Sequence, residues 1–175
     1  MKTTKPDGQR QEIPTDVIAA VLAKRHTSKT RKSMLKEELK NFPRGDKNKF
    51  LLELKILWVI ADIFSIDEIF KKSKIGKAIF TAYMGFLMHE SNNIFKMKPK
   101  ELSLILKQRI ETYEKAWATA HSQGPFYMIG KAFTDIVGHP SAVICFMGSV
   151  QFSGAFIYSP LRKYNEEYEI KINAQ

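Results

Sequence analysis

Apolar residues recur every three or four positions along most of this chain, and this spacing places them on one face of an α-helix. Residues that favour the start of a helix stand before several of these stretches: Pro14, Ser28 and Asp46, and the S-x-x-E pair Ser65 and Glu68. Proline lacks the N–H group left unpaired there, while serine and aspartate accept hydrogen bonds from the first turn. The pattern predicts helices over residues 14–26, 29–42, 46–64, 65–89 in two pieces, 99–121 and 126–137.

Residues 56–64 differ from the other stretches because they are apolar nearly all round. A helix of that kind is covered on several sides, so we expect it at the centre of the fold. Asp62 is the exception within it, and a buried carboxylate is costly unless it is paired. Asp62 is therefore expected either in a structural ion pair or at an exposed gap of the helix. Arg109 and Lys131 also interrupt apolar surroundings and are the candidate partners for such a pair.

The C-terminal part of the chain fits two structures. Residues 150–158 and 168–172 each alternate between apolar and other positions, and a polar loop with a proline joins them, which predicts a β-hairpin. Residues 142–158 also fit one buried helix. We therefore expect a mainly α fold, a compact bundle of about six helices, and we leave open whether a short C-terminal β-hairpin completes it.

The length and composition of the chain indicate one globular unit. A chain of 175 residues with 44% hydrophobic residues is the size of a single domain and has enough apolar surface for a core. The first eleven residues contain no apolar side chain after Met1. We expect residues 1–13 to be a flexible N-terminal segment and residues 14–175 to form one helical domain.

Cysteine content and apolar run length bear on location. Cys145 is the single cysteine, so no disulfide forms within the chain, which is typical of a reducing compartment. No apolar h-region of a signal peptide follows the basic start. The longest apolar stretch, residues 142–158, is interrupted by polar residues, and as a helix it falls short of a hydrocarbon core of ~30 Å. We expect a cytoplasmic protein without a membrane span.

Charge is distributed unevenly along the chain. The net charge is +10, and residues 1–49 carry thirteen Lys and Arg against six Asp and Glu. Within residues 24–49 there are ten basic and three acidic residues. Such a local excess points to an acidic partner rather than to a small neutral substrate.

The basic residues of this region recur at helical spacing. Four lysines of the predicted helix 29–42 are three or four residues apart and share one flank, beside its apolar stripe. Clustered cations of this kind bind phosphates, because each neutralised phosphate releases counterions, although a solvated face also serves solubility alone. We expect a nucleic acid or an acidic protein to be bound by Arg25, Lys29, Arg31, Lys32, Lys36 and Lys40.

Motifs for metal, cofactor and nucleophilic chemistry are absent. His89-Glu90 begins like H-E-x-x-H, but Asn93 stands where the second histidine belongs. The segment Gly124–Ala132 resembles a phosphate loop in part, yet its spacing is one residue too long and it lacks the final Ser or Thr. Cys145 has apolar neighbours, which favours a buried, inert thiol. We expect no cofactor, no metal and no catalysis.

Two alternatives to a basic binding surface remain. One is an enzyme with an unfamiliar site around Asp62, His89 and Asp135, supported only by the presence of titratable groups. The other is a protein-interaction module, such as an adaptor, inhibitor or assembly subunit, that binds through the apolar C-terminal third. Its interface would comprise Phe146, Met147, Phe152, Phe156 and Tyr158.

Overall fold

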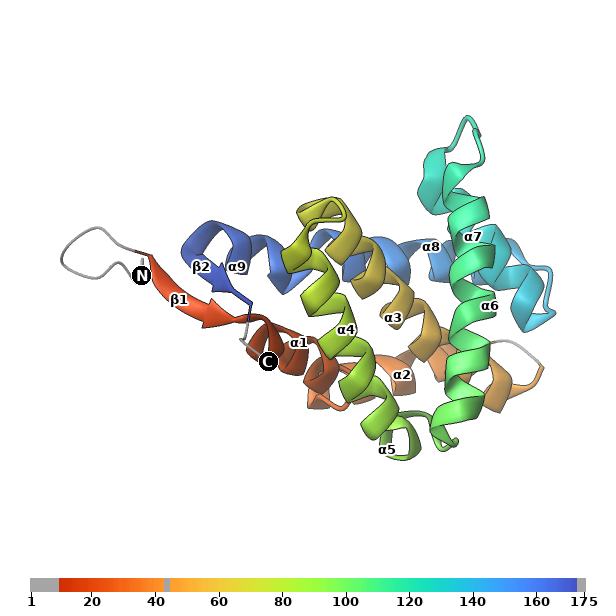
Figure 1. The fold of residues 1–175 in the computed structure, drawn as a ribbon. Coiled ribbons are helices and arrows are strands. Elements are labelled where there is room, and N and C mark those ends of the chain that lie inside the picture. The colour runs from red at the N-terminus through yellow and green to blue at the C-terminus, as the bar shows by residue number, and fades with distance from the viewer. Residues whose placement is uncertain (1–9, 43–44, 173–175) are drawn as a thin grey trace.

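The protein is mainly α-helical, as its sequence predicts, with helices packed around one another and two short strands at one end (Figure 1). The computed structural model describes residues 10–42 and 45–172. In chain order the elements are β1 (Gln11–Pro14), α1 (Thr15–Arg25), α2 (Lys29–Asn41), α3 (Lys47–Phe70), α4 (Lys74–His89), α5 (Ser91–Phe95), α6 (Pro99–Ala118), α7 (Gly124–Val137), α8 (Ala142–Ile157), α9 (Pro160–Glu167) and β2 (Tyr168–Lys171).

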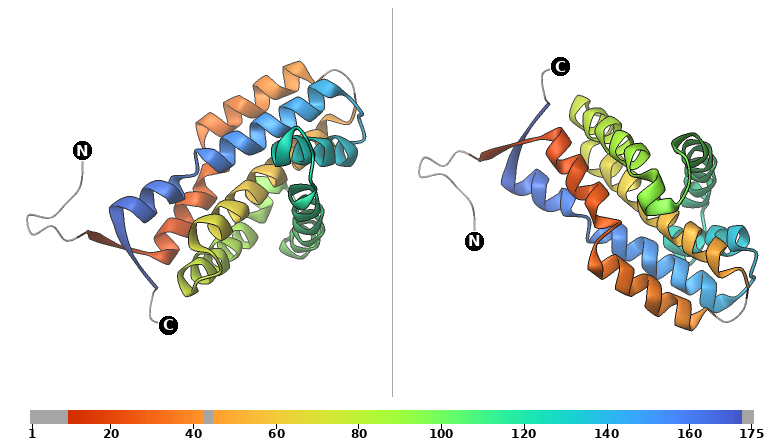
Figure 2. Two further views of the ribbon diagram at one scale, coloured as in Figure 1. Left: turned by 90° about the horizontal axis from the view of Figure 1, so that it is seen from above. Right: turned by 90° about the horizontal axis from the view of Figure 1, so that it is seen from below.

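Helix α3 is the centre of the bundle. It contacts α2, α4, α6, α7, α8 and α9, and the other helices surround it in Figure 2. Every apolar side chain from Leu54 to Ile63 is buried. This confirms the prediction from its all-round apolar composition. The expected N-cap is also present, because the Asp46 carboxylate accepts hydrogen bonds from the N–H groups of Asn48 and Lys49 at 2.9 and 3.0 Å.

The helix break predicted at Ser65 is wrong, and α3 continues to Phe70. The Ser65 hydroxyl is buried and donates to the carbonyl of Ala61, one turn earlier, at 2.8 Å. A serine whose hydroxyl bonds back in this way sits inside a helix and does not cap a new one. The break comes instead at Lys71, whose φ of 45° lies in the left-handed region.

Residues 142–157 form one helix, α8, and the alternative β-hairpin is wrong. Phe152 and Phe156 belong to the alternating pattern that suggested a strand, but they lie one helical turn apart and both face the core. Glycines bring α8 close to α7: a Cβ at Gly130 would overlap the Cys145 carbonyl oxygen, and one at Gly148 would lie 2.8 Å from the Phe133 ring. This close approach fixes α8 against the body of the bundle.

The two strands pair in parallel, which a hairpin cannot do. Ile13 lies opposite Ile170, so segments from the two ends of the helical body meet at one edge of the molecule (Figure 1). Residues 11–13, which were expected to be flexible, belong to this sheet. Arg10 is also described, as an exposed residue next to β1, and residues 1–9 of that expected segment lie outside the described residues.

Candidate functional site

The four lysines predicted on one flank of α2 are all exposed on one side of that helix. We call them the lysine face. The Ser28 hydroxyl caps the helix by accepting from the N–H group of Arg31 at 3.2 Å, as the sequence predicts. Lys40 pairs with Glu37 at 3.2 Å between two exposed side chains. The other three form no ion pair within residues 10–42 and 45–172. The members of the lysine face are Lys29, Lys32, Lys36 and Lys40.

Arg25 and Arg31, which we expected beside these lysines, turn inward instead. Nη1 of Arg25 lies 3.1 Å from Oδ1 of Asp62. Arg31 is only 6% exposed, and its guanidinium carbon lies 3.9 Å above the centre of the Trp58 ring, a cation–π contact. Burial lowers the pKa of Arg31 to about 10. Neither arginine therefore belongs to the open lysine face.

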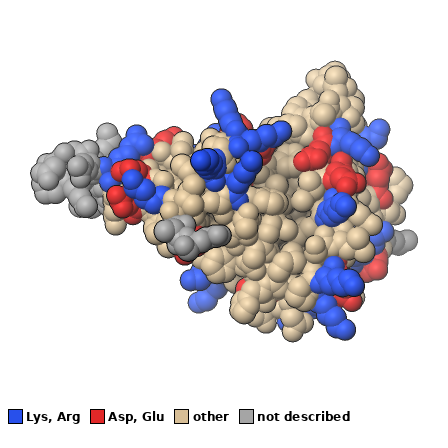
Figure 3. Space-filling model, viewed as in Figure 1, with Lys and Arg blue, Asp and Glu red and all other residues tan. Residues whose placement is uncertain are grey.

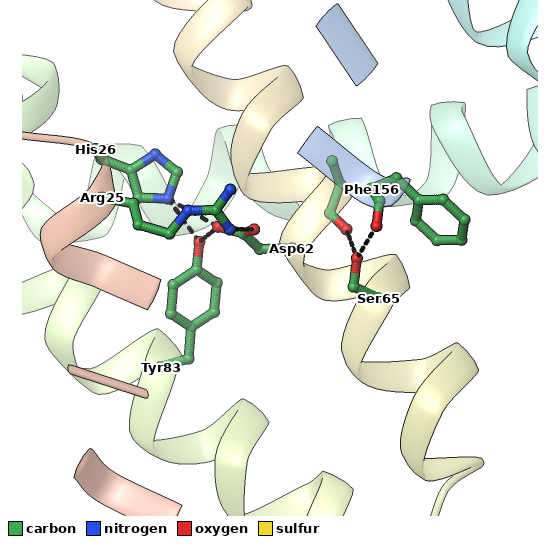
Figure 4. A network of polar contacts seen from close by, with 7 residues as sticks. Arg25, His26, Asp62, Ser65, Tyr83 and Phe156 are labelled. Atoms are coloured by element: carbon green, nitrogen blue, oxygen red, sulfur yellow. Dashed lines mark hydrogen bonds and ion pairs between the residues drawn. The ribbon is translucent and has the colours of Figure 1, made fainter. Parts of the chain in front are cut away.

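Asp62 is the centre of a buried polar network formed by three helices (Figure 4). Its side chain is fully enclosed. The Tyr83 hydroxyl donates to its Oδ2 at 3.1 Å, and Nε2 of His26 lies 3.2 Å from the same oxygen and 2.8 Å from the Tyr83 hydroxyl. Burial, and then the neighbouring carboxylate, raise the pKa of Tyr83 well above its usual value. The ion-pair partner of Asp62 is Arg25.

The partners that we expected for Asp62 lie elsewhere. Arg109 pairs with Glu53, its Nε lying 3.0 Å from a carboxylate oxygen, and Lys131 is exposed. The two ends of the Arg25–Asp62 pair are 37 residues apart. No local pattern links positions so distant, and nothing in the sequence distinguishes Arg25 from Arg109 as the partner of Asp62.

A cavity of about 490 Å³ lies beside this network, between α2 and α8, which run side by side in both views of Figure 2. We call it the arginine pocket. Arg25, Ser28 and Arg31 line it on one side, so the pocket lies at the N-terminal end of α2. Gly154 and Tyr158 belong to the opposite wall, which α8 supplies. Sequence reasoning did not find this pocket, because α2 and α8 are far apart in the chain.

A hydrogen-bonded relay joins the two walls of the arginine pocket. The Trp58 indole N–H donates to Oε1 of Gln151 at 3.1 Å, and Nε2 of Gln151 donates to Oε1 of Glu38 at 2.6 Å. Partial burial raises the pKa of Glu38. The Gln151–Glu38 hydrogen bond joins α8 to α2, and the Trp58 ring packs against the Arg31 guanidinium.

A second cavity, of about 680 Å³, lies between α3, α4 and α6. Its walls are apolar and include Phe64 and Trp117, but its rim carries acidic as well as basic side chains. Four exposed lysines follow one another at the turn between α3 and α4, where Figure 3 shows a basic patch. We call Lys71, Lys72, Lys74 and Lys77 the turn lysines.

The expected apolar interface is divided between core and surface. Met147, Phe152 and Phe156 are buried, whereas Phe146 is 68% and Tyr158 is 81% exposed. Helical geometry explains the division, because only one side of α8 faces away from α3 and α7. The outer stripe of α8 comprises Val143, Phe146, Val150, Ile157 and Tyr158.

The residues of the hypothetical catalytic site are not brought together. Asp62 is enclosed, while His89 and Asp135 are exposed on α4 and α7. Over residues 10–42 and 45–172, no group of three or more His, Cys, Asp or Glu is placed to hold a metal ion. Cys145, which was expected to be buried, is only partly buried. This partial burial still raises the pKa of its thiol, which makes it a poorer nucleophile.

The stretch Ala142–Glu167 is, among the described residues, the one helical stretch long and apolar enough to cross a membrane by length and composition alone. Core helices of water-soluble proteins pass the same test, and α8 buries one side against α3 and α7. No protein-family model, curated protein or solved structure with which the chain was compared matches it.

Proposed function

We propose that this chain is a non-enzymatic binding protein that holds a nucleic acid against the lysine face of α2. The observation that carries the proposal is the exposure of all four lysines along one side of a single capped helix. From Lys29 to Lys40 such a helix rises about 16 Å. Several phosphates of a nucleic acid lie within that length, since duplex DNA carries one negative charge per ~1.7 Å of axis.

Binding of this kind depends on the phosphate backbone and discriminates little between base sequences. Four phosphate contacts predict that the logarithm of the binding constant falls with the logarithm of salt concentration, with a slope of about −3.6 for duplex DNA and about −2.8 for a single strand. Lys40 contributes least to this slope, because Glu37 already neutralises part of its charge. A cytoplasmic location remains a prediction from the single cysteine.

The decisive experiment compares two variants with the same change in net charge. One replaces the four lysines of the lysine face with glutamine, and the other replaces the four turn lysines. Fluorescence anisotropy with a labelled oligonucleotide, single- or double-stranded, gives the affinity at several salt concentrations. We expect the first variant to lose most of its affinity and of its salt slope, while the second keeps both.

Two results contradict the proposal. An equal loss of affinity in both variants means that net charge, and not the lysine face, attracts the strand. An absence of binding to any oligonucleotide at low salt, with retention of an acidic protein from the host, assigns the surface to a different class of partner. Circular dichroism shows whether each variant keeps the helical fold.

The outer stripe of α8 favours a second candidate function, protein interaction. Phe146 and Tyr158 expose large apolar or aromatic surfaces, and residues of this kind are enriched in interface cores. Contact through this stripe would respond little to salt, in contrast to phosphate binding. If Phe146→Asp abolishes a salt-insensitive complex and the lysine-face variant does not, this second function is supported over the first.

A further inference from the structure

We propose that the arginine pocket binds a phosphate monoester, with the phosphate at Arg25 and Arg31 and the organic group against α8. The proposal goes beyond nucleic-acid binding at the lysine face and does not depend on it. A free nucleotide and the terminal phosphate of a nucleic-acid strand both have this chemistry. The experiment below separates them.

The charge balance of the pocket favours an anion. Arg25 and Arg31 supply two guanidinium groups, and within residues 10–42 and 45–172 the one carboxylate bonded to either of them is Asp62, which pairs with Arg25. None of the residues that line the pocket is acidic. Glu38, further along the same helix, is held by Gln151. One positive charge therefore remains without a bonded anion at the wall of a cavity.

Arg31 is the decisive residue, because its guanidinium lines the pocket and has no hydrogen-bond partner among the described residues. It is 6% exposed, and its guanidinium forms no hydrogen bond with another residue in the described part of the chain. Trp58 covers one flat side of the group, which leaves the N–H donors at its edge. No Arg31 nitrogen is among the fully enclosed atoms that lack a partner, so these donors are accessible from the pocket, where a phosphate would accept two parallel bonds from them.

The start of α2 adds a further donor beside the pocket. Ser28 satisfies the N–H group of Arg31, but the N–H group of Thr30, which also lines the pocket, has no acceptor among the described residues. Free N–H groups and the helix dipole make a helix N-terminus attractive to anions. The backbone and the two guanidinium groups thus favour the same ligand.

The opposite wall indicates that the ligand is more than a phosphate ion. The cavity, at about 490 Å³, is large enough for an organic group as well. A Cβ added at Gly154 would meet no atom within 4 Å, so the space beside this part of α8 is open. Tyr158 is 81% exposed and offers an aromatic ring beside the same wall. A planar base or another aromatic group fits this surface by stacking.

The ligand can be tested with the full chain and defined probes. Isothermal titration calorimetry would compare adenosine monophosphate, adenosine and inorganic phosphate, and then oligonucleotides with a 5′-phosphate or a 5′-hydroxyl. We expect the monophosphate to bind, phosphate to bind more weakly and adenosine not to bind. In a Trp117→Phe background, Trp58 is the remaining tryptophan, and its fluorescence should change with the same ligands because it contacts Arg31.

Two variants and one control test the assignment of the site. Arg31→Met should weaken monophosphate binding about tenfold or more, the effect of losing charge-assisted hydrogen bonds. Gly154→Leu fills the pocket without removing a charge and should weaken monophosphate binding more than phosphate binding. It also replaces a helical glycine, which favours the fold. The lysine-face variant should bind monophosphate as the unmodified chain does, so the two proposals succeed or fail separately.

Each outcome supports or overturns the inference. Preference for a 5′-phosphorylated strand over the free nucleotide makes a strand end the ligand, and the reverse preference makes it a nucleotide. The inference is overturned if no phosphate compound binds at millimolar concentration. It is also overturned if Arg31→Met and Gly154→Leu, both folded, bind the monophosphate unchanged.

Discussion

Helix α3 carries two buried carboxylates, Glu53 and Asp62, in surroundings of similar composition. Glu53 is 3% exposed and accepts from Nε of Arg109 with both oxygens at 3.0 Å and from the Tyr113 hydroxyl at 3.0 Å. Asp62 likewise accepts from an arginine and a tyrosine. In each case the ion pair and the phenol satisfy a charge that would otherwise be costly to bury.

The difference lies in what surrounds the two networks. The Glu53 network has one arginine for one carboxylate, and Glu53 lines neither the arginine pocket nor the cavity between α3, α4 and α6. The Asp62 network adjoins the arginine pocket, where Arg31 adds a second guanidinium with no carboxylate bonded to it. A carboxylate, an arginine and a tyrosine are therefore joined at both positions, and at Asp62 the network also includes His26 and adjoins a second arginine whose donors are available to a ligand.

The largest effect is expected from removing one partner of either ion pair. Asp62→Ala leaves Arg25 without its carboxylate, and Arg109→Met leaves Glu53 buried without its guanidinium. We expect each to lower the free energy of unfolding by about 3–5 kcal/mol, measured by urea denaturation. Lys36→Met, at an exposed position of α2, is the control and should change stability by about 0.5 kcal/mol or less.

If both network variants unfold like this control, the carboxylates contribute nothing to stability, and the comparison between the networks loses its basis. If Arg109→Met is destabilising and Asp62→Ala is not, the Arg25 guanidinium that has lost Asp62 is hydrated by solvent, which its partial exposure allows.

Local patterns in the sequence were sufficient for the helices but not for the pairs between them. The cap at Ser28 and the all-round apolar run of α3 depend on neighbouring residues, so they could be predicted. The parallel strand pair and the Arg25–Asp62 pair join distant positions, for which a single sequence holds no signal.

One signal for the site was present. Arg31 lies one helical turn before Leu35, so it continues the apolar stripe of α2 and does not share the side of Lys32. A basic residue in line with an apolar stripe indicates an inward arginine. Its partner Trp58 could not have been predicted in the same way, because α3 is apolar on every side.

A smaller effect is expected from Arg31→Met, and it sharpens the comparison with Arg109→Met. Arg31 has no bonded carboxylate to leave behind in the described part of the chain, and methionine keeps the apolar contact with Trp58. Loss of the cation–π contact is partly offset by the removal of a buried charge, so we expect a cost of about 1 kcal/mol in urea denaturation. A cost equal to that of Arg109→Met would make Arg31 a structural residue and remove the contrast between the networks.

The smallest expected effect concerns pH. Burial raises the pKa of Glu53 above its usual value of 4.5, and Arg109 offsets this only in part. As pH rises above about 4.5, the unfolded chain loses this proton before the folded protein does, so folding stability falls until pH passes the raised pKa. The glutamine of Glu53→Gln does not titrate in this pH range.

The stability of the unmodified chain relative to Glu53→Gln should therefore decrease across that pH window and become constant above it. Urea denaturation of both proteins at a series of pH values measures the difference. The raised pKa of Glu38 contributes equally to both and cancels, and Glu111→Gln, at an exposed position of α6, is the matched control. A relative stability that increases with pH would mean that Arg109 outweighs burial, and Glu53 would then be held as a carboxylate by its ion pair.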